Sequence, residues 1–205
     1  SVISRKFYIT TAIDYVNARP HLGTAYEKIG ADVLARYHRL AGDDVFFLMG
    51  NDEHSQNVAT SAEKLGLDPH TYCDQMEPLF REAWGALDVS FDEFIRTTQP
   101  HHLAAVREIL DRVIAKGDIY KDKYEGWYCV GCEAFVPEKD LVEGFCPNHG
   151  KRKPDWISEE NYFFKLSKYE QALRDHYAAH PEFVRPAPFR NELLAVMKDG
   201  LRDIS

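Results

Sequence analysis

The sequence predicts an α/β protein, with an open parallel sheet in its first half followed by a smaller β-rich region. Two observations support this fold class. Over residues 6–116, short apolar runs rich in aromatic and β-branched residues alternate with segments whose apolar residues recur every three or four positions. After Gly117 the chain changes to short alternating stretches, turns and clustered cysteines. Strands that alternate with helices are typical of a parallel sheet.

The first predicted strand covers residues 6–13, and a helix is expected over residues 24–40. This helix is expected to bury one face and to end at Gly42, which suits a C-terminal cap. The apolar residues of that face are Tyr26, Ile29, Val33, Tyr37 and Leu40. A nearly continuous apolar run over residues 44–50 predicts a second strand, covered on both faces as in a parallel sheet.

Two helices are expected next, one over residues 55–65 closed by Gly66 and one opened by Asp68-Pro69. Cys73 lies alone in the second of these helices and is interpreted as a core residue. The apolar stripe of that helix is Tyr72, Met76, Leu79, Phe80 and Trp84. A third strand is predicted over residues 92–98. A helix follows over residues 101–116 and carries Leu103, Val106, Leu110 and Val113 on one side.

The region after residue 117 is expected to be a small β-rich unit built around a metal. Near its end, Ser167 and Glu170 have the spacing of a capping box, which predicts a helix through about residue 179. A last helix is expected over residues 191–198.

Composition limits the function classes. Hydrophobic residues make up 44% and charged residues 28%, which is ordinary for a soluble globular protein. No apolar run reaches the ~20 residues of a membrane span, and the first residues lack a signal-peptide pattern, so we expect a cytoplasmic protein without a membrane partner. The net charge of −8 argues against non-specific coating of DNA or RNA.

The strongest local motif is a set of paired metal ligands. Cys129 and Cys132 are separated by two residues, and so are Cys146 and His149. Thiolates and a neutral imidazole are ligands that tetrahedral zinc prefers, and four protein ligands leave no open position. The spacing therefore predicts a structural zinc site. The alternatives are a coincidental thiol pair and an iron–sulfur site.

The stretch around Pro20 lies between the first strand and the first helix. A helix N-terminus offers free N–H groups and a partial positive charge, which suit a phosphate. Gly23 has no Cβ, so a flat ligand could lie against its backbone, and His21 could donate to phosphate oxygens. Taken alone, the same pattern also fits an ordinary strand-to-helix turn.

A second polar stretch, residues 49–56, follows the second strand. Ligands of open α/β sheets bind outside the carboxyl ends of the strands, so Asp52, Glu53 and His54 are expected to line the same crevice as His21. A carboxylate there could pair with a substrate ammonium group. The alternative is an acidic turn that caps the next helix.

Taken in order, these segments resemble the methionine–tRNA ligases, a family of class I aminoacyl-tRNA synthetases. The matching segments are "FYITTAIDYVNARPHLGTAY", "FFLMGNDEHSQNV", "YCVGCEAFVPEKDLV…CPNHG", "NYFFKLSKY" and "RNELL…GLRDIS". The resemblance covers essentially the whole chain. It implies a Rossmann-like nucleotide-binding half-domain over residues 1–116. It also implies a connective insertion over residues 117–205, with a zinc knuckle over 129–149.

The resemblance implies ATP, L-methionine and tRNA(Met) as partners, with Mg²⁺ accompanying ATP and zinc in a structural role. By this resemblance the catalytic residues are His21 and Thr24, and the ATP-binding residues are His21, Gly23 and Thr24. The methionine-binding residues would be Ile13, Tyr15 and Asp52, with Asp52 holding the α-ammonium.

The chain also departs from the family pattern. Thr24 stands in place of a second histidine, and a hydroxyl cannot carry positive charge. Ala12, Asp14, Met49, Asn51 and Ser55 differ from the residues common there. The family's Lys-Met-Ser-Lys-Ser segment is absent, so we expect an N-terminal portion that forms aminoacyl-adenylate inefficiently by itself.

Three competing functions remain open from the sequence. Another class I synthetase, such as the cysteine or valine enzyme, is one, although the chain has no cysteine before Cys73. A small nucleotidyltransferase is the second, although those domains lack a zinc insertion. A zinc-bearing module that binds tRNA or protein is the third, and the only basic run for it is residues 151–153.

Overall fold

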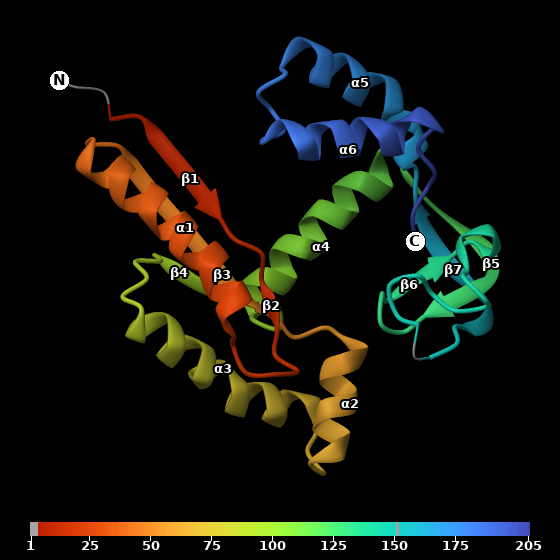
Figure 1. The fold of residues 1–205 in the computed structure, drawn as a ribbon, viewed down its shortest axis with the longest axis horizontal. Coiled ribbons are helices and arrows are strands. Elements are labelled where there is room, and N and C mark those ends of the chain that lie inside the picture. Colours follow the sequence, from red (N-terminus) through yellow and green to blue (C-terminus); the bar gives the residue numbers. More distant parts are fainter. Residues whose placement is uncertain (1–3, 151) are drawn as a thin grey trace. The chain divides into compact units, whose positions relative to one another are not determined.

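The computed structural model describes residues 4–150 and 152–205, and Figure 1 shows their course. Residues 1–3 of the N-terminal stretch and residue 151 of the basic run lie outside the described residues. The chain divides into two compact units, Ser1–Val106 and Arg107–Ser205. This division falls within helix α4 (Pro100–Ala115), and the domain boundary after residue 116 stays a prediction.

The first unit is built on a parallel sheet, which confirms the predicted α/β class. Strand β3 lies at its centre. One edge of β3 pairs first with β1 and then with β2, and the other edge pairs with β4. The strand predicted over residues 6–13 is interrupted, because residues 11–13 lie outside β1 and β2. The N–H of Thr11 still donates to the carbonyl of Leu48 at 3.3 Å. The strands are β1 (Lys6–Thr10), β2 (Asp14–Tyr15), β3 (Asp44–Asp52) and β4 (Glu93–Arg96).

The predicted helix signals are mostly confirmed. The predicted start at Asp68 is confirmed, because its side chain accepts the N–H of Thr71 at 3.0 Å. Ser55, predicted as the first residue of its helix, is the N-cap and accepts the N–H of Asn57 at 3.0 Å. Gly42, Gly66 and Gly117, identified as helix ends, all have positive φ. The first helix begins two residues earlier than predicted. The helices are α1 (Leu22–Leu40), α2 (Gln56–Lys64), α3 (Pro69–Ala86) and α4.

The predicted buried face of α1 is wrong. Within the structure described, Tyr26 is 83% exposed and Tyr37 is 64% exposed. The helix instead buries a stripe of small and paired charged residues, which are Ala25, Lys28, Ala31, Asp32 and Ala35. Small side chains let a helix lie close to a sheet, and the two charged residues have partners that compensate their burial. The apolar stripe of α4 is likewise left unburied.

The core of the first unit joins the sheet to α1 and α3. Phe47 and Met49 of β3 are fully buried against Phe80 and Trp84 of α3. Cys73 belongs to this core, and burial raises the pKa of its thiol to about 11, which confirms its interpretation as a core residue. The opposite side of β3 is less covered, since Phe46 is 43% exposed.

The second unit contains a three-stranded antiparallel sheet with β5 at its centre. Its strands are β5 (Ile119–Cys129), β6 (Ala134–Val136) and β7 (Asp155–Phe164), and its helices are α5 (Glu170–Ala179) and α6 (Ala187–Lys198). Two short 3₁₀ turns, Glu138–Asp140 and Leu166–Tyr169, complete the unit. Among the helices described in either unit, none is long and apolar enough to cross a membrane.

The predicted capping box before α5 is wrong. Ser167 lies in the preceding 3₁₀ turn and donates its hydroxyl to Asp203 at 2.6 Å. Glu170 accepts the backbone N–H of Leu201 at 2.8 Å instead of capping its own helix. Both side chains therefore fasten the chain after α6. Helix α6 itself starts four residues before the predicted position.

Candidate functional site

A pocket of about 390 Å³ lies where β2 leads into α1. It belongs entirely to the first unit. Its wall includes several of the residues that the sequence predicted to bind ligands. The interruption between β1 and β2 and the start of α1 therefore meet at one cavity. The lining residues are Ile13, Asp14, Tyr15, Asn17, Ala18, Arg19, Pro20, His21, Thr24 and Phe80.

His21 is the N-cap of α1, and its bonds are reciprocal. The backbone N–H of Gly23 donates to Nδ1 of His21 at 3.1 Å. The Thr24 hydroxyl donates to the His21 carbonyl at 2.9 Å and accepts the His21 N–H at 3.4 Å. Because Nδ1 uses its lone pair as an acceptor, the neutral ring carries its proton on Nε2. The cap therefore leaves an N–H donor on the far side of the ring.

Gly23 lies close against that ring. A Cβ at this position would lie 3.0 Å from Cε1 of His21 and 3.1 Å from Nδ1, which is tighter than ordinary contact. The free N–H groups of the first helical turn and the positive end of the helix dipole lie beside it. Together His21, Gly23 and Thr24 form one arrangement suited to an anion.

Two of the predicted methionine-binding residues, Tyr15 and Asp52, lie on neighbouring strands, and Ile13 lies just before β2. In the pairing of β2 with β3, Tyr15 lies opposite Asp52 at the carboxyl ends of both strands. Ile13 and Tyr15 line the pocket, whereas Asp52 lies next to Tyr15, outside the described lining. Asp52 Oδ1 accepts the N–H of His54 at 2.9 Å. The ligand roles of these three residues stay predictions.

Glu53 turns into the protein rather than into the crevice. Its carboxylate is buried, and Oε1 lies 2.5 Å from Nε of Arg96. Arg96 also binds Asp74 at 2.6 Å. Burial opposes the charge of Arg96, but these two carboxylates raise the pKa of its guanidinium overall. Glu53 therefore anchors the loop after β3 instead of offering a ligand.

The four predicted metal ligands come together in the second unit. Their ligand atoms all lie within 4.8 Å of one another. Sγ of Cys132 lies 3.5 Å from Sγ of Cys146 and 3.2 Å from Nδ1 of His149, and Sγ of Cys129 lies 3.7 Å from the same nitrogen. Ligand atoms at ~2.0–2.3 Å from one tetrahedral zinc ion are ~3.5–3.8 Å apart. The donor set and its spacing thus fit zinc.

The electrostatics of this cluster favour a cation. Burial raises the pKa of the Cys132 thiol to about 11, and the neighbouring sulfurs add to the rise. For Cys146 burial acts in the same direction, but hydrogen bonds from Asn148 and His149 outweigh it and lower the pKa to about 6. Crowded thiols of this kind lose their protons together only when a positive ion offsets their charge.

Sequence reasoning missed Gly131, which holds the cluster in place. A Cβ on this residue would lie 2.6 Å from Cδ2 of the His149 ring, closer than real Cβ contacts allow. The sequence shows that Gly131 lies between the two cysteines of the first pair, but it does not show the contact of Gly131 with a ring 18 residues later. Gly131 therefore leaves the space in which His149 faces the thiols.

Three further positions, one glycine and two charged residues, were also missed. A Cβ on Gly50 would lie 2.3 Å from the carbonyl oxygen of Ile95, so only glycine lets β3 approach β4 at the end that carries Asp52. Glu27 and Lys28 of α1 both reach the interruption between β1 and β2. Charged residues inside a predicted helix gave no signal of such contacts.

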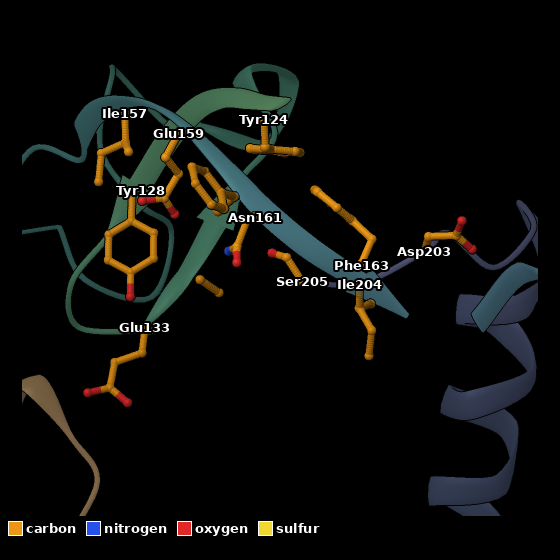
Figure 2. A pocket seen from close by; sticks show the side chains of 12 residues that line it. Tyr124, Tyr128, Glu133, Ile157, Glu159, Asn161, Phe163, Asp203, Ile204 and Ser205 are labelled. Atoms are coloured by element: carbon orange, nitrogen blue, oxygen red, sulfur yellow. The ribbon is translucent and has the colours of Figure 1, made fainter. Parts of the chain in front are cut away.

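A second pocket, of about 510 Å³, lies against the small antiparallel sheet, and Figure 2 shows its side chains. Phe135 packs at a centroid distance of 4.2 Å from Tyr124 and 5.2 Å from Tyr128. Glu133 and Glu159 also line it. None of the residues predicted to bind a substrate or metal is among its described lining.

Comparison with known proteins places the chain in a family. The family model described as tRNA synthetases class I (M) matches residues 7–155. A methionine–tRNA ligase of Thermosynechococcus vestitus is 50% identical over 99% of this chain and 39% of its own length. One from Thermotoga maritima is 48% identical over 98% of this chain and 32% of its own length.

Solved structures agree. Methionyl-tRNA synthetase of Mycobacterium tuberculosis in complex with methionyl-adenylate superposes with a TM-score of 0.93 at 42% identity, over 98% of this chain and 40% of that chain. The free state of the same enzyme gives a TM-score of 0.77 at 39% identity. The chain thus spans about a third to two-fifths of the length of these relatives. By family model, sequence identity and fold, the chain belongs to the class I tRNA synthetases (M), the family of the methionine–tRNA ligases.

Proposed function

We propose that this chain is the N-terminal part of an ATP-dependent ligase that activates methionine as methionyl-adenylate and transfers it to tRNA(Met). The observation that carries the proposal is the reciprocal cap of His21 and Thr24 at a pocket of about 390 Å³, in a chain of this family. It unites a helix N-terminus, a donor nitrogen and a strand end at one cavity. These are the groups that a nucleotide and an amino acid need side by side.

The first proposed step is attack of the methionine carboxylate on the α-phosphate of ATP. A bond forms between a carboxylate oxygen and phosphorus, and the bond to the bridging oxygen breaks, which releases pyrophosphate. The protein aligns the reactants and stabilises charge on the phosphate oxygens. His21 would donate from Nε2 while the α1 cap fixes its ring, and Mg²⁺ accompanying ATP would offset further negative charge.

Methionine would lie on the strand side of the pocket. We assign its α-ammonium to Asp52, whose Oδ1 already holds the turn to His54, so the ammonium would take Oδ2. Tyr15 lies opposite Asp52 in the strand pairing and would cover the amino acid with its ring. The main chain at Ile13 would complete the contact. This arrangement would direct the substrate carboxylate toward the helix start.

The Cys129, Cys132, Cys146 and His149 cluster would hold zinc with four protein ligands. A closed four-ligand site supplies folding energy rather than a reactive water. We therefore assign the metal a structural role: it would fasten the loops after β5 and let the second unit keep a fixed surface for the acceptor end of tRNA.

The test is ATP–pyrophosphate exchange by the full-length protein with a panel of amino acids. We expect exchange that depends on methionine and not on cysteine or valine. His21→Ala should lower kcat by ~100-fold, because it removes a donor to developing charge, and should change methionine binding much less. His70→Ala, an exposed residue of α3, is the matched control and should leave both unchanged. Exchange with another amino acid, or equal losses of rate and binding in His21→Ala, would contradict the proposal.

A further inference from the structure

Ala12, in the interruption between β1 and β2, has both of its backbone groups bound by side chains of α1. Its N–H donates to Oε1 of Glu27 at 2.5 Å. Its carbonyl accepts from Nζ of Lys28 at 2.7 Å. Ala12 lies between β1 and β2, outside both strands, so these bonds replace the strand pairing that it lacks. We name this pair of contacts the Ala12 clamp.

The Lys28 ammonium is the buried centre of the clamp. Its side chain is 0% exposed, and Nζ also lies 3.3 Å from Oδ1 of Asp14 and 3.4 Å from Oε2 of Glu27. All three donors of the ammonium are thereby directed to oxygen atoms, which compensates for the loss of water. Because these acceptors include the carbonyl of Ala12, the charge is tied to the backbone of the interruption.

The same place holds polar atoms whose burial is not fully compensated. Burial raises the pKa of the Asp14 carboxyl, and Lys28 offsets only part of the rise. Oδ2 of Asp14 and both side-chain polar atoms of Asn51, its partner in the strand pairing, are buried with no hydrogen-bond partner among the described residues. Such costs concentrate where a local geometry is needed for function.

The clamp joins the two sides of the pocket through one helix. Ile13 and Tyr15, on either side of Asp14, line the pocket from the strand side. His21 caps the same helix that carries Glu27 and Lys28. At ~1.5 Å per residue, the clamp is only ~9–10 Å along the axis from that cap. Helix α1 can therefore fix the distance between an anion at its start and the backbone at residue 13.

We propose that Glu27 and Lys28 are positioning residues for the amino acid: by holding Ala12, they set the main chain of Ile13 and the ring of Tyr15 against the substrate. This inference rests on the proposed function. The inference goes beyond the proposed function because it assigns the geometry of the methionine-binding side of the pocket to a buried ion cluster that does not contact the substrate. The helix cap at His21 has its own hydrogen bonds, so the nucleotide side does not depend on the clamp.

The kinetic test uses the full-length enzyme and separates the two substrates. Lys28→Met and Glu27→Leu should each raise KM for methionine by ~10-fold or more, because small misplacements of a substrate wall are costly. KM for ATP should change by less than ~2-fold. Glu27→Gln keeps an oxygen acceptor for the Ala12 N–H and should stay close to wild type in both.

Asp32→Asn is the matched control. Asp32 is a buried charge on the same helix, and its Oδ1 accepts the N–H of Ser90 at 2.7 Å, away from the clamp. Its loss should lower stability without changing the ratio of the two KM values. Equal rises of both KM values in Lys28→Met and Glu27→Leu, or a rise confined to ATP, would overturn the positioning role.

A second measurement does not depend on catalysis. Hydrogen–deuterium exchange of the full-length protein should show a protected amide at Ala12 in a peptide over residues 8–16. Exchange there should be ~10-fold faster in Glu27→Leu and unchanged in Asp32→Asn. If the wild type shows no methionine-dependent activity, the proposed function fails while the clamp is still tested by this protection. If protection is lost but KM for methionine does not move, the positioning inference fails alone.

Discussion

The start of α1 and the Cys/His cluster are both constellations of polar groups, but they are held in opposite ways. At the α1 start, His21 and Thr24 bind one another and the backbone, so the chain's own hydrogen bonds satisfy the arrangement. In the cluster, Sγ of Cys132 lies 3.5 Å from Sγ of Cys146 and 3.2 Å from Nδ1 of His149, so several metal-ligand atoms crowd one another. The first geometry is therefore held by the chain's own hydrogen bonds, whereas we propose that the second is held by a bound cation.

Both the α1 start and the Cys/His cluster contain a histidine ring that packs closely against a glycine. A Cβ on Gly23 would approach the His21 ring to 3.0 Å, and a Cβ on Gly131 would approach the His149 ring to 2.6 Å. A Cβ on Gly23 would require only a small shift of the His21 ring, whereas a Cβ on Gly131 would displace the His149 ring from its position. The comparison indicates that a side chain at Gly131 would disturb its histidine more than a side chain at Gly23 would disturb His21.

Metal removal should give the largest effect and is the most direct way to break this comparison. Structural zinc contributes on the order of 10 kcal/mol to small domains, and its binding releases thiol protons. Chelation should therefore unfold the loops over residues 129–149 and leave the first unit folded, with easier metal loss at lower pH. The measurement is hydrogen–deuterium exchange of both units with and without chelator, alongside metal analysis. Equal protection of the two units under chelation would contradict the distinction.

Gly50→Ala should have the next largest effect, in the region that needs no metal. The added Cβ would meet the Ile95 carbonyl at 2.3 Å, which forces β3 away from β4 and should lower the free energy of unfolding by ~3 kcal/mol. Gly30→Ala is the matched control, because nothing lies within 4 Å of its Cβ in the middle of α1. It should raise stability by ~1 kcal/mol. Denaturant unfolding of both variants measures the difference in sign.

Gly131→Ala should act mainly on metal affinity. Displacement of the His149 ring leaves three thiol ligands, so we expect affinity for zinc to fall by ~10–100-fold, as with other losses of ligand support. Gly150→Ala, next to the same histidine but with nothing within 4 Å of its Cβ, should bind zinc normally. Competition against a chromophoric chelator measures both. Equal affinities in the two variants would show that Gly131 does not position the ligand.

Sequence patterns predicted where helices and strands begin and end better than they predicted which faces of these elements are buried. Helix ends at Gly42, Gly66 and Gly117 and the cap at Asp68 depend on local backbone chemistry, which a sequence displays directly. The clustering of the four predicted ligands was predictable for the same reason, since two residues between paired ligands restrict them to one turn. Burial was less predictable: the periodicity of α1 identified an apolar stripe but not that its alanine and ion-paired face would pack on the sheet.

The parts of the site that sequence reasoning missed involve residues far apart in the chain. The contact of Gly131 with His149 and that of Gly50 with Ile95 depend on how segments approach one another in three dimensions. The bonds of Glu27 and Lys28 to Ala12 depend on an interruption of the first strand that its run of aromatic and β-branched residues did not reveal. Each becomes visible only when the neighbouring backbone is in place.

Thr24→Val should have the smallest effect and tests whether the α1 start is held by its hydrogen bonds. Valine keeps the shape of threonine but removes the hydroxyl that donates to the His21 carbonyl and accepts its N–H, so the free energy of unfolding should fall by ~1 kcal/mol. Thr24→Ser keeps both bonds and should be nearly neutral. Thermal unfolding measures the stability, and methionine-dependent exchange by the full-length enzyme should follow it, with a lower kcat in the valine variant only. A valine variant with unchanged stability and rate would mean that the backbone N–H groups of α1 hold the His21 ring without help from Thr24. The contrast with the Cys/His cluster would then depend on the backbone hydrogen bonds of the helix rather than on the Thr24 hydroxyl.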